Sequence, residues 1–184
     1  MTKIYKLTDE KGRTYNQTQW AENVTHEGTG RGELCSAGWI HAYTHPLLAV
    51  LLNPMHANFE SPILWECKGK IEKREHYDLK VGCRSLTTIR KIALPKVTTI
   101  QRQAFAILVV KEVYKDKDWN LWADNWLSGK DRSAYAARAA AYAAARAADA
   151  AYAARAAADA ARAAYEPKLK FNLLRVAKHA VKNF

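Results

Sequence analysis

The sequence predicts an α+β protein: a small mixed sheet with helices, followed by a long Ala-rich helix and a short basic amphipathic helix. Three observations predict this class. Short runs rich in β-branched residues dominate before residue 95, helical spacing of apolar residues dominates after it, and 22 of the 31 residues from 134 to 164 are alanine. The expected domains are an α+β domain at 1–127, the Ala-rich helix at 128–166 and the basic C-terminal helix at 167–184.

The first half of the chain predicts strands around one short helix. Strands are expected at 3–8, 38–43, 63–72 and 86–92, because apolar and β-branched residues alternate there between turn residues. Residues 16–32 are polar and glycine-containing, which is typical of a loop. Proline suits the first helical turn, so His45 and Pro46 indicate a helix start, and Asn53-Pro54 is expected to end that helix.

Two further helices are expected before the Ala-rich segment. Thr98 or Thr99 can cap one that runs to about Tyr114. Asp118 can cap the next, at 119–127, whose tryptophans at 119, 122 and 126 share one face. The final stretch, 171–184, has an apolar face made by Leu173, Leu174, Ala177, Ala180, Val181 and Phe184, with basic residues on the rest of the surface.

The Ala-rich segment predicts a straight helix of about 45 Å, because no glycine, proline or β-branched residue interrupts it. Its tyrosines, arginines and aspartates follow one winding ribbon, and the rest of the surface is methyl groups. Such a helix can pack on its own domain or against a second copy of the chain. The candidate residues for self-association are Tyr135, Arg138, Tyr142, Arg146, Tyr152 and Arg155.

The formal charge of +11 indicates an anionic partner, such as nucleic acid or a nucleotide. The excess lies mainly in residues 51–100 and in the tail 168–184, which has five basic residues and no acidic one. Solvated strand faces and a tail packed on its own domain would give the same pattern. The candidate contacts are Lys68, Lys70, Lys73, Arg74, Lys80, Arg84, Arg90, Lys91, Lys178 and Lys182.

Patterns for metal, cofactor or nucleophilic chemistry are weak. His41 and His45 are four residues apart, but no CxxC or HExxH motif accompanies them, so we expect no metal and no cofactor. The three cysteines are widely spaced, which favours reduced, mostly buried thiols. Arg31, within the glycines at 28–32, could approach a phosphate, although a flexible loop explains the same residues. A small transferase-like enzyme centred on His41 and Tyr43 is an alternative.

Two stretches resemble small phage and prophage proteins of unknown function. One is Gly38-Trp39-Ile40-His41-Ala42 with Pro46-Leu47, which is similar to a G-[FW]-H-A segment before a P-L helix, with Ile40 inserted. The other is the run from Trp126-Leu127 to Arg132-Ser133, which is similar to a W-L-x-G-x-D-R junction into an Ala-rich tail. The resemblance spans roughly 35–165 and brings no catalytic residues.

The phage setting implies a non-enzymatic accessory protein that binds and inhibits a host factor, with an anti-CRISPR-like or other anti-defence role. Its partner would be a host protein or ribonucleoprotein. Direct binding of nucleic acid or a nucleotide is the main alternative. No apolar run is long enough for a membrane span, and the first residues do not resemble a signal peptide, so the expected location is the cytoplasm of a bacterial host cell.

Overall fold

A computed structural model describes residues 3–74, 80–133 and 172–184. Contacts divide the chain into two compact units, one made of residues 1–105 with 172–184 and one of residues 106–171. The expected α+β class is confirmed. Residues 134–171 lie outside the described residues, and they include all six self-association candidates and most of the expected Ala-rich helix, so that helix and the three-domain division stay predictions.

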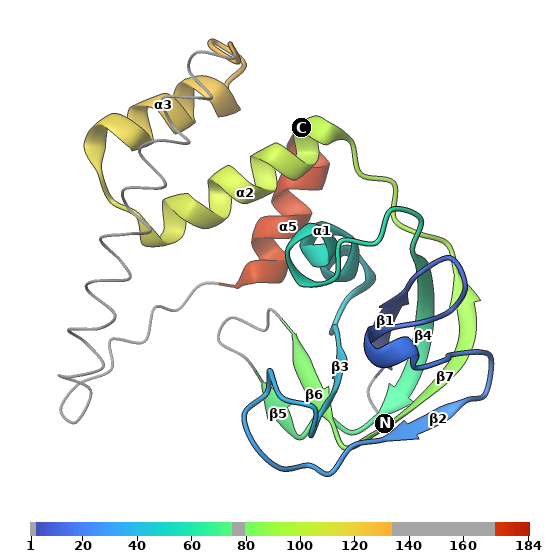
Figure 1. Cartoon of the computed structure of the whole chain (residues 1–184). Helices are drawn as coiled ribbons and strands as arrows, with labels where there is room; N and C mark the ends of the chain where they lie inside the picture. Colours follow the sequence, from blue (N-terminus) through green and yellow to red (C-terminus); the bar gives the residue numbers. More distant parts are fainter. Residues whose placement is uncertain (1–2, 75–79, 134–171) are drawn as a thin grey trace, which may run out of the picture. The chain divides into compact units, whose positions relative to one another are not determined.

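The first unit contains two antiparallel sheets (Figure 1). The larger has the order β1-β4-β7-β2, and the smaller has the order β3-β6-β5. The strands of the larger sheet are β1 (Lys3–Thr8), β4 (Ile63–Gly69), β7 (Ser85–Ile92) and β2 (Thr25–Glu27). Those of the smaller sheet are β3 (Ile40–Ala42), β6 (Val81–Cys83) and β5 (Lys73–Arg74). A bridge between Tyr5 and Tyr43 links β1 to the end of β3.

The two sheets share one bent hairpin. β4 pairs with β7, and β5 pairs with β6. The two ladders are separated by residues 70–72 between β4 and β5, and by Arg84 between β6 and β7. The inner face holds the core, which is centred on Ile4, Trp20, Ala42, Trp65, Cys67, Val81, Cys83 and Leu86. The sequence missed β2, β5 and β6, because strands of two or three residues are too short to show an alternating pattern.

Helix α1 (Pro46–His56) contacts both β1 and α5 (Leu173–Asn183), so it lies between the sheet and the C-terminal helix (Figure 1). The expected stop at Asn53-Pro54 is wrong, because Pro54 lies inside α1. Proline lacks the N–H that would reach the carbonyl of Val50. That carbonyl instead accepts a hydrogen bond of 2.9 Å from Nη1 of Arg102, which belongs to α2 (Thr99–Val113).

Local capping explains where the other helices begin. Thr98 Oγ1 accepts from the Gln101 amide and Gln101 Oε1 accepts from the Thr98 amide, so α2 begins with a capping box. The second unit contains α3 (Lys117–Leu127), which Asp116 caps by accepting from the Trp119 amide at 2.8 Å. The expected cap at Asp118 is therefore wrong by two residues.

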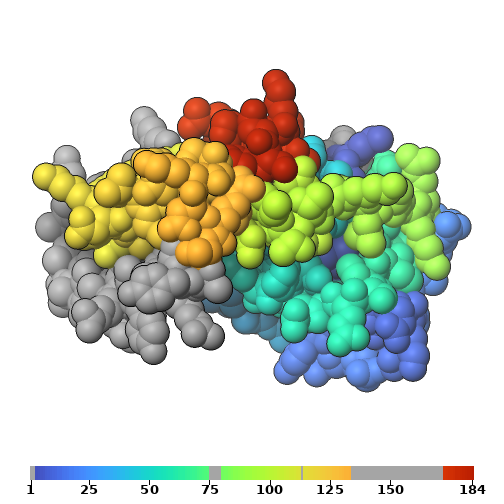
Figure 2. Space-filling view, turned by 90° about the horizontal axis from the view of Figure 1, so that it is seen from above, coloured from blue at the N-terminus to red at the C-terminus, as the bar shows by residue number. Residues whose placement is uncertain are grey.

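The C-terminal helix α5 begins at Leu173 and is capped by Asn172, whose side chain accepts from the Arg175 amide. The expected amphipathic helix is confirmed, with Leu173, Ala177 and Ala180 of its predicted apolar face buried. Val176, which the prediction left out of that face, is also buried, whereas Leu174, Val181 and Phe184 are only partly buried. Gln101 donates to the Val181 carbonyl oxygen at 2.9 Å and joins the start of α2 to α5. Figure 2 shows α5, in red, beside the light-green atoms at the start of α2.

Candidate phosphate-binding site

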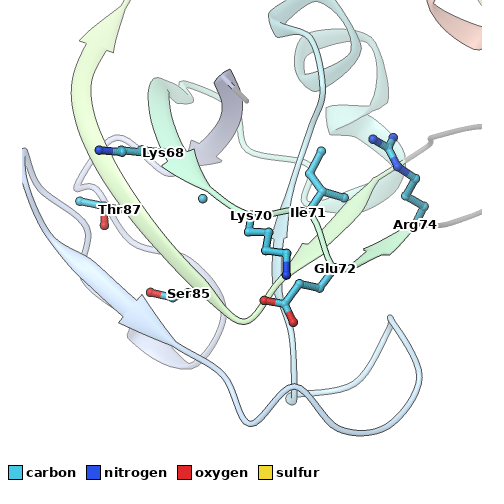
Figure 3. Close-up of a pocket in the computed structure, with 8 residues that line it drawn as sticks. Lys68, Lys70, Ile71, Glu72, Arg74, Ser85 and Thr87 are labelled. Atoms are coloured by element: carbon cyan, nitrogen blue, oxygen red, sulfur yellow. The ribbon is translucent and has the colours of Figure 1, made fainter. Parts of the chain in front are cut away.

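A hollow of about 690 Å³ lies where β4 leaves the larger sheet and the chain turns toward β5. We call it the basic hollow (Figure 3). The described residues that line it are Lys68, Gly69, Lys70, Ile71, Glu72, Arg74, Ser85 and Thr87. Three of the ten cations that the sequence analysis singled out, Lys68, Lys70 and Arg74, therefore line the same hollow.

Strand pairing places the two flanks of the basic hollow together. Lys68 lies directly opposite Thr87 in the β4–β7 ladder. The next residue, Gly69, faces inward, where a Cβ atom would lie only 2.9 Å from the backbone oxygen of Ser85 and 3.1 Å from Ile4 Cδ1. Glycine at this position lets β4 and β7 stay paired right up to the break in the ladder.

The described lining residues of the basic hollow carry a net charge of +2, from three cations and the carboxylate of Glu72. Figure 3 shows the side chains of Lys70 and Glu72 pointing to the same side, while Arg74 points away from them. Ser85 and Thr87 add two hydroxyls on the β7 flank. Among the described lining residues none is aromatic, so the hollow offers charge and hydrogen bonds to phosphate oxygens rather than a surface for stacking bases.

Lys73 does not line the basic hollow, although it stands next to Arg74. Its Nζ donates to the Gly32 carbonyl oxygen at 2.8 Å, lies 3.3 Å from a carboxylate oxygen of Glu33, and sits 5.9 Å from the centre of the Trp39 ring. Trp39 in turn donates to the same Gly32 carbonyl. Lys73 therefore fastens the glycine-containing loop onto the smaller sheet.

Arg90 is held by Glu66. The carboxylate of Glu66 accepts from Arg90 at 2.9 Å and lies 3.2 Å from Nζ of Lys3. Hydrogen bonds from Arg90 first, and then from Lys3, hold the pKa of Glu66 below its ordinary value. The two cations thus share one carboxylate. Lys3 lies opposite Lys68 in the β1–β4 ladder.

Lys91 lies on another part of the larger sheet. Its Nζ sits 5.4 Å from the centre of the Trp65 ring, and it lines a second hollow of about 440 Å³ with Lys11, Glu10 and Glu22. Two lysines and two glutamates cancel there. Arg84 is exposed, and its side chain approaches Gly30, while Lys80 is partly buried.

The glycine-containing loop is packed through its own backbone rather than open. Gly30 donates to the Gly38 carbonyl oxygen, and Gly28 donates to that of Arg84. A Cβ atom on Gly38 would lie 2.0 Å from the Arg31 carbonyl oxygen. Arg31 itself is exposed, so the alternative of a phosphate contact at this residue stays a prediction.

His41, His45 and Tyr43, which the sequence analysis considered for chemistry, have structural partners. His41 Nε2 makes a hydrogen bond with the Leu34 carbonyl oxygen, and Tyr43 Oη lies 3.0 Å from His56 Nδ1. His45 Nδ1 accepts from the Leu47 amide at 3.1 Å, which confirms the expected helix cap. Burial, and then the charge of Lys178, lower the pKa of His45 and so favour the neutral ring that can accept.

Lys6 is a buried charge that the sequence analysis missed. Its Nζ donates to the His41 carbonyl oxygen at 2.9 Å and lies 4.7 Å from the centre of the Trp20 ring. Burial lowers the pKa of Lys6 to about 8. In the sequence, Lys6 occupies an inward position of the alternating run at 3–8, and that register is the signal that could have revealed it.

Burial raises the pKa of Cys67 to about 12 and that of Cys83 to about 11, so both thiols are poor nucleophiles. Cys35 is exposed. Within residues 3–74, 80–133 and 172–184, no group of three His, Cys, Asp or Glu side chains is arranged to hold a metal ion. No helix among those residues has the length and apolar character needed to cross a membrane.

No family model matches the chain, and comparison with curated proteins and with solved structures finds no significant match.

Proposed function

We propose that the chain is a non-enzymatic binding protein that contacts the phosphate backbone of nucleic acid through the basic hollow. The observation that supports this most directly is the composition of the described lining, which has Lys68, Lys70 and Arg74, the hydroxyls of Ser85 and Thr87, and one carboxylate. Lysine, arginine, serine and threonine are the side chains that most often contact phosphates.

The expected mode of binding does not depend on base sequence. The described lining has no aromatic ring to stack on a base and no side-chain amide of the kind that reads adenine, so the binding we expect rests on its cations and hydroxyls at the phosphates. Binding of this kind is dominated by the release of counterions, so its affinity falls as salt concentration rises.

The test is the affinity of the full chain for a fluorescein-labelled oligonucleotide, measured by anisotropy at low salt. We expect the variant Lys68→Glu/Lys70→Glu to bind at least tenfold more weakly than the wild type, because two phosphate contacts are lost and the new carboxylates repel the phosphates. The matched control, Lys117→Glu/Lys130→Glu, changes the net charge equally at exposed positions of the second unit. Equal losses in both variants would show that net charge alone drives binding and would overturn the assignment to the hollow.

The proposal is compatible with the phage accessory role that the sequence resemblance suggests. A host ribonucleoprotein would present the same phosphates, whereas a host protein without nucleic acid would have to present carboxylates. Capture of partners from bacterial extract, with and without nuclease, separates these cases. A partner retained after nuclease treatment and lost in Lys68→Glu/Lys70→Glu would favour the inhibition of a host protein instead.

A further inference from the structure

The outer face of α5 carries a row of exposed cations, Arg175, Lys178 and Lys182, which we call the cation stripe. Their spacing of three and four residues places them on one side of the helix over about 10 Å. The N-terminal cap at Asn172 and the burial of the opposite face fix the orientation of the helix that carries them.

No acidic residue offsets the cation stripe in the elements that pack around it. Helix α1, residues 99–105 of α2 and residues 172–184 contain no Asp or Glu. Among the described residues none of the three cations makes an ion pair, whereas Lys3 and Arg90 both pair with Glu66. The positive field is felt inside the unit, since the charge of Lys178 helps to lower the pKa of His45.

The apolar face of α5 is already occupied. Leu173, Val176 and Ala180 are buried, and the helix contacts α1. A helix that binds a membrane surface inserts its apolar face between the lipids, which α5 cannot do while it is packed in this way. None of the exposed residues of 172–184 is Trp, Tyr or Phe, and of the residue types that are enriched at the hot spots of protein interfaces this face presents only Arg175. A row of phosphates needs only the charges.

We propose that the cation stripe of α5 is a second nucleic-acid contact, which binds backbone phosphates separately from the basic hollow. This inference rests on the proposed function for its ligand, but it concerns different residues on a different element. It predicts that each site contributes its own share of the salt dependence of binding.

The experiment compares the full chain with the variant Arg175→Gln/Lys178→Gln/Lys182→Gln. The probes are a single-stranded oligonucleotide of about 20 nucleotides and a duplex of about 20 base pairs, both long enough to offer many phosphates. Their affinity for each protein is measured by fluorescence anisotropy across a series of salt concentrations. We expect the slope of log K against log salt to become shallower by about 2 to 3, which is 0.7 to 0.9 for each lost phosphate contact. The control is Lys115→Gln/Lys117→Gln/Lys130→Gln, which removes the same number of positive charges from the second unit. Its slope should equal that of the wild type, apart from a small change caused by the lower net charge.

The outcomes separate this inference from the proposed function. If the stripe variant keeps the wild-type affinity and slope while Lys68→Gln/Lys70→Gln loses both, the second contact is wrong and the proposed function stands. If only the stripe variant loses affinity, α5 is the contact and the basic hollow is not. If the stripe variant binds oligonucleotides normally but no longer binds vesicles of anionic lipid, the stripe is a lipid contact and the inference is overturned. Circular dichroism should confirm that each variant retains its helix content.

Discussion

Arg102 Nη1 donates a hydrogen bond of 2.9 Å to the carbonyl oxygen of Val50, the acceptor that Pro54 cannot serve. The side chain of one helix thus supplies the donor that the backbone of another helix lacks. This relationship lets α1 continue past Pro54 to His56, and it joins α1 to the start of α2.

Replacing Arg102 should therefore destabilise the chain in a way that depends on residue 54. Arg102→Met leaves the Val50 carbonyl without its donor, and we expect a loss of about 1 to 3 kcal/mol in the free energy of unfolding. In a Pro54→Ala background the new backbone N–H can serve the same carbonyl, so the loss should fall to less than half. Urea unfolding of the four proteins measures both values. Equal losses in the two backgrounds would show that the bond to Val50 does not carry the effect.

The buried Lys6 predicts an unusual dependence of stability on alkaline pH. Its pKa is about 8 in the folded chain and near 10.5 when exposed, so between these values the unfolded chain binds more protons and stability rises with pH. Cys67 and Cys83 act in the opposite direction from pH 9, because burial keeps their pKa values at about 12 and 11 while the unfolded thiols ionise. Stability should therefore rise from pH 8 to about pH 9 and fall above it.

Lys6→Met is the matching control, because it removes the titrating amine and keeps an unbranched side chain. Urea unfolding at pH 7, 8, 9 and 10, under reducing conditions, should show no rise between pH 8 and 9 in this variant. A wild-type chain whose stability is flat or falling over that interval would mean that Lys6 is charged and solvated at alkaline pH, contrary to its burial.

Neutralising Glu66 should strengthen the binding of polyanions. Glu66→Gln releases Lys3 and Arg90 from their ion pairs, and Lys3 lies opposite Lys68 at the edge of the basic hollow. We expect severalfold tighter oligonucleotide binding at low salt, with a steeper salt dependence. The pKa of Glu66 is lower in the folded chain than in the unfolded chain, so the wild type loses the stability that this carboxylate contributes as the pH falls. Glu66→Gln lacks that contribution at every pH, so its stability should fall less on acidification. Unchanged affinity in Glu66→Gln would place the ligand away from this edge.

Much of the fold could be predicted from the sequence, because β1, β7, α2, α3 and α5 are long enough to show a period of 2 or 3.6 residues. The errors concern features that depend on contacts between distant residues. Pro54 looks like a helix stop until Arg102, 48 positions later, is known to serve the Val50 carbonyl. The very short strands β5 and β6 are specified by their partners rather than by their own pattern.

The candidate site was foreseen only as a set of cations without their partners. Composition indicated that residues 68–91 are basic, but not that Lys73 is bound to the glycine-containing loop or that Arg90 forms an ion pair with Glu66. That Lys68, Lys70 and Arg74 line one hollow depends on where β4 ends and the chain turns toward β5, which the charge pattern does not predict.

The salt dependence of oligonucleotide binding by the wild-type chain tests the central claim most directly. We predict that the logarithm of the binding constant falls linearly with the logarithm of the salt concentration between about 50 and 200 mM, where phosphate contacts weaken strongly. We also predict that Lys68→Gln/Lys70→Gln makes the slope shallower by about 1.4 to 1.8, the share of two phosphate contacts. An affinity that does not change with salt, or a slope that this variant leaves unchanged, would contradict the assignment of the basic hollow as a phosphate-binding site.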